Sequence, residues 1–417
     1  MSADPDVVIV GGGLAGLCCA LQLHQSGISS QILEASDGVG GRVRTDKAEG
    51  FLFDRGFQVL LTAYPEARRV LDYDALGLRP FYPGALIRYK KRFYRFADPW
   101  RHPIDGLLGL FAPIGSFSDK LRVRKLRTHV VKGSLSDLYN RPEMTTLQAL
   151  RDIGFSENMI DRFFRPFIGG VFFDSTLGVS SRMFEFGFRM FSMGDTALPS
   201  GGMGAIPEQI AARLPAGMVR TEARVESIEE DGVILKSGEK IKARSVVVAT
   251  EGPEAARLLG DKEKPGSRSV TCLYYETDEP PISEPLLILN GEGKGPINSL
   301  CSPSSVAPNY APKNKALLSI TIIGNPDSND QQLETAVRTQ LIEWFGPTSK
   351  SWRYLRTYRI PHALPMQVPP VSDPALRPAR IRAGLFTCGE YQNVASIQWA
   401  MVSGRQAAEA VIDWLRK

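Results

Sequence analysis

Several signatures that would place this chain in a specialised class of protein are missing from its 417 residues. No uninterrupted apolar stretch approaches the roughly 20 residues that a membrane-spanning helix needs. The five cysteines form no C-x-x-C pair and no metal-ligand spacing, so we expect structural cysteines, a reducing compartment and no bound metal. The four histidines make no convincing Ser-His-Asp or metal arrangement.

Nucleic-acid binding and disorder find no support either. The formal net charge is only +5, and no basic run is interleaved with aromatic residues. There is no repeat and no low-complexity tail. A hydrophobic content of 43% with 23% charged residues is ordinary for a globular chain. The first strand begins so close to Met1 that no signal or transit peptide precedes it in this sequence, and we expect a cytoplasmic protein.

What is present begins with a glycine-rich turn. Val7–Val10 is a short β-branched run, as expected of a buried parallel strand, and a G-x-G-x-x-G follows at Gly11, Gly13 and Gly16. Gly11 permits the tight turn, Gly13 lets the backbone approach a pyrophosphate, and Gly16 lets the next helix pack on the strand. The pattern predicts a dinucleotide-binding unit.

The segment after the turn completes that unit. A helix is predicted from Leu14 to about Gln25, and its N-terminal amides, from Leu14 and Ala15 on, would face the phosphates. A second strand over 30–33 delivers Glu34 at its end. A carboxylate at this place accepts hydrogen bonds from ribose hydroxyls and repels a 2′-phosphate.

Motifs at both ends of the chain narrow the cofactor. After Glu34-Ala35 come Gly40-Gly41-Arg42 and Phe53-Asp54-Arg55-Gly56, and near the end stands Cys388-Gly389-Glu390, ahead of a helix-like run from about Ser396 to Leu415. With these motifs the chain resembles the flavin amine oxidase superfamily, which includes monoamine oxidases, protoporphyrinogen oxidases and phytoene-type carotenoid desaturases. The resemblance spans roughly residues 7–59, 199–260 and 384–415 and implies an FAD-dependent oxidoreductase.

The resemblance also implies which residues hold FAD. In the family the GGR stretch passes beside the pyrophosphate, and the segment after the Asp-x-Gly, here from Gly56 on, reaches the isoalloxazine ring. A valine, here Val225, touches the adenine. The acid of the closing motif, here Glu390, binds the ribityl or pyrophosphate part of FAD. The last helix should aim its amides at the flavin's pyrimidine edge. The family usually has glycine at the position of Trp399, so this ring is expected to narrow the space near the flavin. The expected cofactor-binding set is Gly11, Gly13, Leu14, Ala15, Gly16, Glu34, Ala35, Gly41, Arg42, Gly56, Phe57, Gln58, Val59, Val225, Gly389, Glu390, Ser396 and Ile397.

The same resemblance implies an α/β fold with two interleaved parts. Residues 1–75, 199–262 and 378–417 should form a discontinuous, Rossmann-like FAD-binding domain. Residues 76–198 and 263–377 should form an inserted α+β substrate-binding domain. The first insertion is expected to be rich in helices and the second to contain strands, such as those over 270–275 and 316–323, with a helix over 330–344.

A basic helix in the first insertion has two interpretations. Between Asp119 and Lys132 there are six Lys or Arg and one acid, and Val123, Leu126 and Val130 share one helix face, downstream of the apolar segment 105–115. This face would suit a peripheral membrane contact, with the cations at lipid headgroups, or would simply pack on the protein. The stretch 103–125 also resembles plant-type phytoene and ζ-carotene desaturases, which take lipophilic substrates from membranes.

Aromatic residues gather in the same insertion. Nine of the chain's 20 Phe lie between Phe163 and Phe191, and Phe184, Phe188 and Phe191 are at helical spacing. Such a cluster would line a long apolar cavity or would form ordinary core. The segment 394–404 looks closest to the carotenoid desaturase branch of the family.

The leading prediction is a hydride transfer to the flavin N5 from a hydrophobic, isoprenoid or carotenoid-like substrate, in a desaturation, oxidation or isomerisation. His362 is the candidate acid or base, and the electron acceptor is left open. The alternatives are an amine or protoporphyrinogen-type oxidase that uses oxygen, and an FAD-binding assembly or chaperone-like factor without catalysis. The expected partners are a lipophilic small molecule and no nucleic acid.

Overall fold

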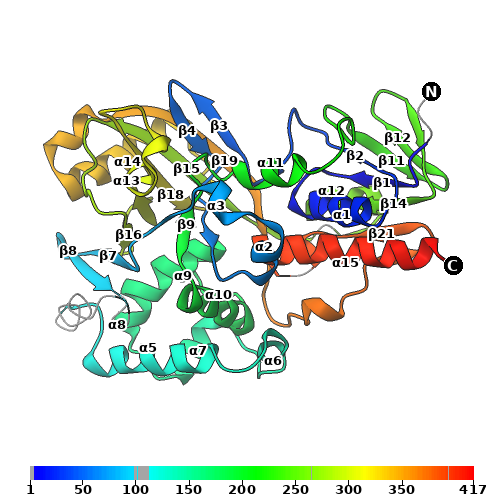
Figure 1. Cartoon of the computed structure of the whole chain (residues 1–417). Helices are drawn as coiled ribbons and strands as arrows, with labels where there is room; N and C mark the ends of the chain where they lie inside the picture. Colours follow the sequence, from blue (N-terminus) through cyan, green and yellow to red (C-terminus); the bar gives the residue numbers. More distant parts are fainter. Residues whose placement is uncertain (1–3, 98–100, 102–111, 264, 393) are drawn as a thin grey trace.

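Two β-sheets organise the molecule, one in each half of Figure 1. The computed structural model describes residues 4–97, 101, 112–263, 265–392 and 394–417. The half that holds both chain ends contains a six-stranded sheet, and the other half contains a seven-stranded sheet with a group of helices below it (Figure 1).

The six-stranded sheet is parallel apart from one edge strand. Its order is β10 (Val219–Arg220), β2 (Ser30–Leu33), β1 (Val7–Val10), β14 (Ser245–Val248), β21 (Leu385–Thr387) and the antiparallel β20 (Arg380–Arg382). β1 is buried throughout because both faces of the sheet are covered, which explains its unbroken β-branched sequence. All six strands come from segments 1–75, 199–262 and 378–417.

Alternate residues of β1 face different layers. Val7 and Ile9 pack in one core with α1 (Leu14–Gln25) and α15 (Ile397–Leu415). Val8 and Val10 pack in another with a three-stranded sheet of β11 (Val225–Glu229), β12 (Gly232–Leu235) and β13 (Lys240–Lys242). This half is therefore a three-layer structure, as a Rossmann-like domain requires.

The first and last long helices lie against one another (Figure 1). A Cβ at Gly404 of α15 would lie 2.1 Å from the carbonyl oxygen of Ala15 in α1, so only glycine allows this close approach. The end of the chain thus completes the layer that its beginning starts.

The seven-stranded sheet belongs to the other half. Its order is β19 (Arg353–Pro365), β15 (Ser267–Thr277), β18 (Ala316–Ile323), β17 (Ser299–Cys301), β16 (Leu287–Asn290), β7 (Gly84–Tyr89) and β8 (Arg92–Ala97), antiparallel except for β16 with β7. Leu333, Val337 and Leu341 of α14 (Asp330–Phe345) cover one face. The opposite face meets the main core.

Helices fill the space below this sheet. They are α5 (Phe117–Val130), α6 (Leu135–Tyr139), α7 (Thr146–Asp152), α8 (Glu157–Met159), the π-helix η1 (Ile160–Phe164), α9 (Arg165–Phe172) and α10 (Ser181–Met193). The remaining elements connect the two halves or lie at their edges: β3 (Thr45–Ala48), β4 (Phe51–Asp54), β5 (Leu60–Leu61), α2 (Pro65–Val70), α3 (Tyr73–Leu76), β6 (Arg79–Pro80), β9 (Thr196–Leu198), α11 (Ala205–Ala211), α12 (Gly252–Leu259), α13 (Pro303–Val306), η2 (Pro308–Tyr310), η3 (Pro347–Ser351), η4 (Pro374–Leu376) and η5 (Glu390–Gln392).

The predicted α/β fold class is confirmed, and the opening helix and strand have the expected bounds. The membrane interpretation of the face formed by Val123, Leu126 and Val130 is wrong. Leu126 and Val130 are 2% and 0% exposed, and α5 packs with this face against the protein core and α10. Most of the apolar segment 105–115 lies outside the described residues. Among the described residues, no helix is long and apolar enough to cross a bilayer.

Candidate flavin and substrate site

The carboxyl ends of four parallel strands meet at one large cavity. β1, β2, β14 and β21 end beside Gly11, Glu34, Ala249 and Gly389, and all four residues line the same cavity of about 590 Å³. Ligands of doubly wound sheets bind outside the carboxyl ends of the strands, where the strand order reverses. The cavity lies at this place.

The three glycines of the turn have different surroundings. Gly11 has φ +109°, which only glycine adopts freely, and its N–H donates to the Leu33 oxygen at 2.8 Å. Gly13 lines the cavity, and a Cβ there would meet no atom within 4 Å. Gly16 does not line the cavity, and a Cβ there would lie 2.0 Å from the Gly11 oxygen. Gly13 leaves an open cradle, whereas Gly16 packs the helix on the turn.

Glu34 is held by backbone and side-chain donors. One carboxylate oxygen accepts the Gly12 N–H at 2.6 Å, and the other accepts the Ser36 N–H at 2.9 Å and the Ser36 hydroxyl at 2.7 Å. The side chain lines the cavity next to Ala35 and Val225, in the place that the sequence predicts for the adenosine end. Its bond to a ribose stays a prediction.

Arg42 and Glu390 join the two ends of the chain. Their guanidinium and carboxylate form an ion pair, and Arg42 also donates to the Ala363 oxygen at 2.9 Å. Burial raises the pKa of Glu390, while the neighbouring Arg42 acts in the opposite direction. Both side chains line the cavity, so one charged pair links the GGR turn, the closing motif and β19.

The wall segment Gly56–Val59 follows the buried carboxylate of Asp54, which is fixed by three hydrogen bonds. Asp54 accepts the Thr45 hydroxyl at 2.5 Å, the Tyr310 hydroxyl at 2.7 Å and the Met203 N–H at 2.9 Å. Complete burial raises the pKa of Asp54 from 3.8 to about 6. Sequence reasoning quoted this residue only as part of a motif and missed its role as an anchor between the two halves.

The second half of the cavity is built by the insertions. The seven-stranded sheet contributes one wall, and α9 and α10 contribute another. The lining residues from these insertions are Pro166, Phe167, Gly170, Val171, Phe172, Phe173, Phe186, Gly187, Phe191, Val270, Leu287, Ser299, Thr321, Ile360, Ala363 and Leu364.

Only part of the aromatic cluster faces this cavity. Phe184 is fully buried in the core, whereas Phe186 and Phe191 of the same helix line the cavity. Phe173 also lines it, with φ +52°, a left-handed conformation that costs a non-glycine residue energy. Gly187 of α10 also lines the cavity, and a Cβ there would lie 3.6 Å from the ring of Phe172, which is an ordinary contact distance.

Charge in the wall is confined to the dinucleotide half. Each arginine that lines the cavity is paired: Arg42 with Glu390, Arg55 with Asp46 at 2.9 Å, and Arg224 with Glu254 at 3.3 Å. The described lining residues from 76–198 and 263–377 include no Asp, Glu, Lys, Arg or His. This part of the cavity therefore suits an uncharged, lipophilic molecule.

The structure places two other predicted residues away from the cavity. The ring of His362 contacts the Ser267 hydroxyl at 2.7 Å through Nδ1 and is not among the lining residues, unlike its neighbours Ala363 and Leu364. Trp399 does not line the cavity either. Its ring packs on Tyr139 and Phe186 with centroids 6.0 and 6.1 Å apart, so the expectation that it narrows the flavin space is wrong.

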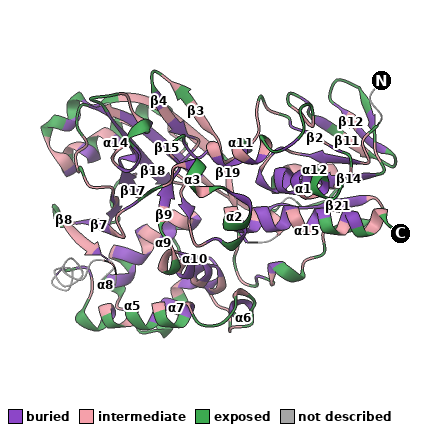
Figure 2. Ribbon diagram, in the orientation of Figure 1, coloured by how far each residue is buried: buried purple, intermediate pink, exposed green. Residues whose placement is uncertain are grey.

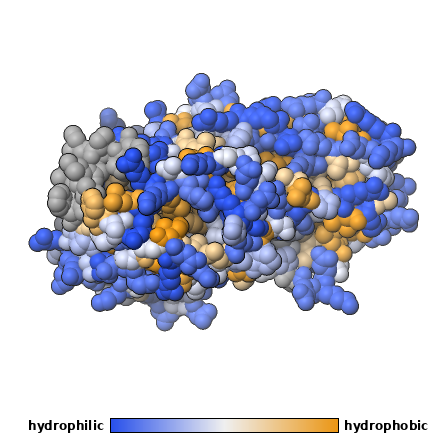
Figure 3. All heavy atoms as spheres, turned by 90° about the horizontal axis from the view of Figure 1, so that it is seen from below, coloured by the Kyte–Doolittle hydropathy of each residue, from blue (hydrophilic) through white to orange (hydrophobic). Residues whose placement is uncertain are grey.

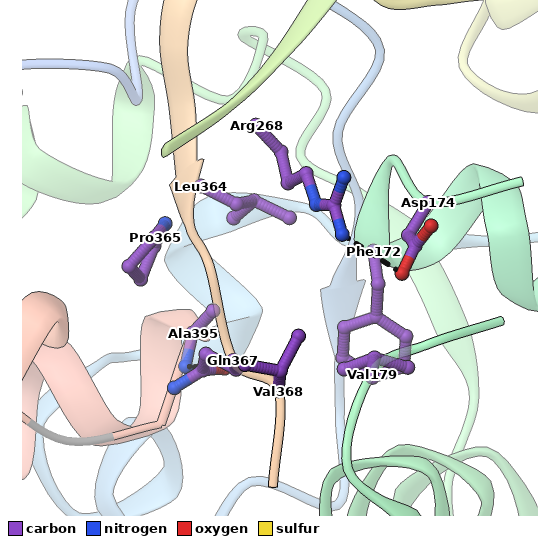
Figure 4. A pocket seen from close by; sticks show the side chains of 9 residues that line it. All are labelled: Phe172, Asp174, Val179, Arg268, Leu364, Pro365, Gln367, Val368 and Ala395. Atoms are coloured by element: carbon purple, nitrogen blue, oxygen red, sulfur yellow. Dashed lines mark hydrogen bonds and ion pairs between the residues drawn. The ribbon is translucent and has the colours of Figure 1, made fainter. Parts of the chain in front are cut away.

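A small side pocket adjoins the main cavity (Figure 4). It has a volume of about 10 Å³, room for about one water, and shares Phe172, Leu364 and Ala395 with the main cavity. Figure 4 shows Arg268 and Asp174 pointing toward one another across it, and their ion pair measures 3.1 Å.

Of the expected cofactor-binding set, every residue except Gly16 lines the main cavity. The cavity is also lined by residues after β14 that sequence reasoning did not single out, namely Thr250 and Glu251 of the loop and Glu254 of α12. Their position after a buried parallel strand was the available signal, because the carboxyl ends of such strands share one edge.

Comparison with known proteins agrees with this geometry. Residues 14–412 match the family of flavin containing amine oxidoreductases, and the chain belongs to this family. It is thus a flavin-dependent oxidoreductase. The open cradle at Gly13 and the glycine turn at the strand ends fit a flavin dinucleotide.

The curated relatives match over limited segments. Protoporphyrinogen oxidase 2 of Arabidopsis thaliana is 26% identical over 164 residues, 39% of this chain and 32% of the relative. A probable flavin-containing monoamine oxidase A of Dictyostelium discoideum is 38% identical over 147 residues, 31% of this chain and 30% of the relative. The 4,4′-diaponeurosporene oxygenase of Staphylococcus aureus is 36% identical over 58 residues, 14% of this chain and 12% of the relative. The chain spans about a third or less of the length of these relatives.

Solved structures share the whole fold. An oxidoreductase from Methanosarcina mazei superposes with a TM-score of 0.74 at 17% identity, covering 98% of this chain and 99% of the other. Putrescine oxidase bound to putrescine gives a TM-score of 0.71 at 15% identity, covering 99% of both chains. At these identities the likeness shows the fold alone.

Proposed function

We propose that this chain binds FAD and oxidises, desaturates or isomerises an uncharged lipophilic substrate of isoprenoid or carotenoid-like character. When bound, a flavin accepts a hydride at N5. The chain's part is to orient the two molecules and to keep water out. At the N-terminus of α15 the Ser396 hydroxyl accepts a hydrogen bond from the Trp399 N–H at 3.2 Å. This helix end lines the cavity, so its positive dipole potential favours negative charge there.

The observation that carries the substrate class is the uncharged wall. Phe167, Phe172 and Phe191 supply apolar surface, and Ser299 and Thr321 are the hydroxyl-bearing residues of the insertion wall. An amine substrate would bring a cation, and a polycarboxylate would bring anions. Leaving either charge without a partner in an apolar wall is costly. A neutral polyene or other isoprenoid incurs no such cost.

The test is anaerobic mixing of the purified holoprotein with three panels: neutral polyenes in detergent micelles, primary amines, and porphyrinogens. We expect the visible absorbance of oxidised flavin to be lost with a polyene and retained with amines. Reduction by amines or porphyrinogens instead would replace the substrate class by the corresponding oxidase. A flavin that none of the panels reduces, with the polyenes recovered unchanged in bond number and geometry, would favour an assembly or chaperone-like role.

A matched pair of variants separates binding from chemistry. Gly187→Phe adds a ring in the uncharged wall, and we expect retained flavin with slower reduction by the polyene. Phe184→Leu changes the same helix within the core, outside the cavity wall, and should leave the reduction rate near that of the parent. Equal effects of the two variants on reduction would argue against the assigned wall.

A further inference from the structure

The outward side of α5 carries two large apolar residues followed by cations. Phe117 and Leu121 are one helical turn apart and are 62% and 48% exposed. Arg124 and Lys125 follow on the same side and are also exposed. Figure 2 shows exposed residues along α5, which lies at the lower edge of the molecule. This side is opposite to the buried Leu126 and Val130.

The cations of this side have no acid beside them on the helix. Asp119 is the one carboxylate of α5, and it is fully buried. It accepts the hydroxyls of Ser116 and Ser156, each at 2.7 Å, so its charge is used inside the protein. Positive charge and apolar surface are therefore exposed together, without a carboxylate of the same helix to offset them.

A third apolar residue borders this surface. Ile153, at the end of α7, is 38% exposed. The next residue, Gly154, lies against α5, because a Cβ there would be 3.1 Å from Nε of Arg122. Seen from below in Figure 3, apolar groups are set among hydrophilic ones on this side of the molecule. We call Phe117, Leu121, Arg124, Lys125 and Ile153 the docking face.

We propose that the docking face binds the surface of an anionic lipid bilayer, with Phe117 and Leu121 in the headgroup region and Arg124 and Lys125 at the lipid phosphates. Exposed apolar side chains beside cations match the two components of such a surface, apolar depth and negative charge. A nucleic acid or an acidic protein would account for the cations but not for the protruding Phe and Leu.

The docking face lies close to the part of the cavity where we expect the lipophilic substrate to bind. α5 packs on α10, and Phe186, Gly187 and Phe191 of α10 line the uncharged part of the cavity. A docked bilayer would lie one helix layer from the place where a lipophilic substrate reacts. Docking itself needs no substrate, so its test is independent of the proposed reaction.

The first experiment is flotation of the holoprotein with vesicles of phosphatidylcholine alone or mixed with phosphatidylglycerol. We expect flotation with the anionic vesicles, weakened by salt. Arg124→Gln/Lys125→Gln should weaken binding by about fivefold for each cation removed. The matched control, Lys240→Gln/Lys242→Gln, removes the same charge from exposed lysines of the three-stranded sheet and should bind within about twofold of the parent. Equal weakening of both variants would mean that net charge alone explains the attraction, and it would refute the docking face.

The second experiment reports insertion. All five native cysteines are buried, so a polarity-sensitive fluorophore on Leu121→Cys labels one site. We expect its emission to shift to the blue on anionic vesicles. Ile381→Cys, whose parent residue is 50% exposed on β20, is the control and should show no shift. No shift at position 121, or binding of soluble acidic polymers but not vesicles, would refute the bilayer as partner. A chain that fails to bind vesicles but still oxidises a polyene in detergent would leave the proposed function intact.

Discussion

The buried carboxylate of Asp54 should make the stability of this protein depend on pH in an unusual direction. Asp54 is surrounded by Thr45, Met203 and Tyr310, and burial raises its pKa from 3.8 to about 6. Replacing it by Asn keeps the size of the side chain and one oxygen acceptor but removes the titration. The variant Asp54→Asn therefore isolates the contribution of this one proton to folding.

The magnitude follows from the shift of the pKa. A difference of about 2 units between the unfolded and folded states corresponds to about 3 kcal/mol of unfolding free energy. The folded protein holds the proton more tightly than the unfolded chain. The stabilisation is therefore complete below about pH 4 and is lost as the pH rises through about 6. The unfolding free energy of the parent minus that of Asp54→Asn should fall by about 3 kcal/mol across this range.

The assay is urea unfolding of both proteins at a series of pH values. Asp46→Asn is the control on the same hairpin. Burial raises the pKa of Asp46, but hydrogen bonds from Arg55 and Tyr358 outweigh it, and the net pKa is lowered. Its contribution is present at neutral pH and is lost on acidification, which is the opposite sign. A parent-minus-variant difference for Asp54→Asn that stays flat from about pH 4 to about pH 7, or that rises, would refute the reasoning.

Three further outcomes are expected. Gly13→Val should fold but purify with little flavin, whereas Gly16→Ala should lose several degrees of melting temperature, because its Cβ would lie 2.0 Å from a carbonyl oxygen. Flavin content and thermal unfolding of both variants would show the contrast. Equal flavin content in the parent and Gly13→Val would contradict this prediction. The five thiols should resist a water-soluble thiol reagent in the native protein, since all are buried and burial raises the pKa of Cys388 to about 12. Rapid native labelling would argue against this buried arrangement. Arg42→Met should lower the flavin affinity, since it leaves the buried carboxylate of Glu390 unpaired; a flavin titration that matches the parent would disagree.

Most of the dinucleotide-binding half could be predicted from local sequence patterns. Val7–Val10, the three glycines and Glu34 lie within one short βαβ unit, where strand, turn and helix periodicity decide the structure almost alone. The same reasoning placed the ends of β14 and β21 at a common edge only through the family resemblance. Nothing in the local sequence shows that Val10 pairs with Val248, because that contact joins residues far apart in the chain.

The substrate half was less predictable because helical spacing does not say what a face meets. Leu126 and Val130 have the spacing of a lipid-facing stripe, yet they pack on protein. Phe184 and Phe186 are two residues apart on one helix, and only the second reaches the cavity. Which aromatic residues face the open space depends on how α10 packs against α5 and α9, and this is a tertiary fact.

The ion pair between Arg42 and Glu390, and the contact of Gly404 with Ala15, have a consequence for the order of biosynthesis. The glycine turn leaves the ribosome well before β21 and α15, which close its cavity. A nascent chain therefore has no complete pocket to offer a flavin. Cofactor capture must follow the synthesis of α15, and until then the apolar faces of β1 and α1 depend on partners that have not yet been made.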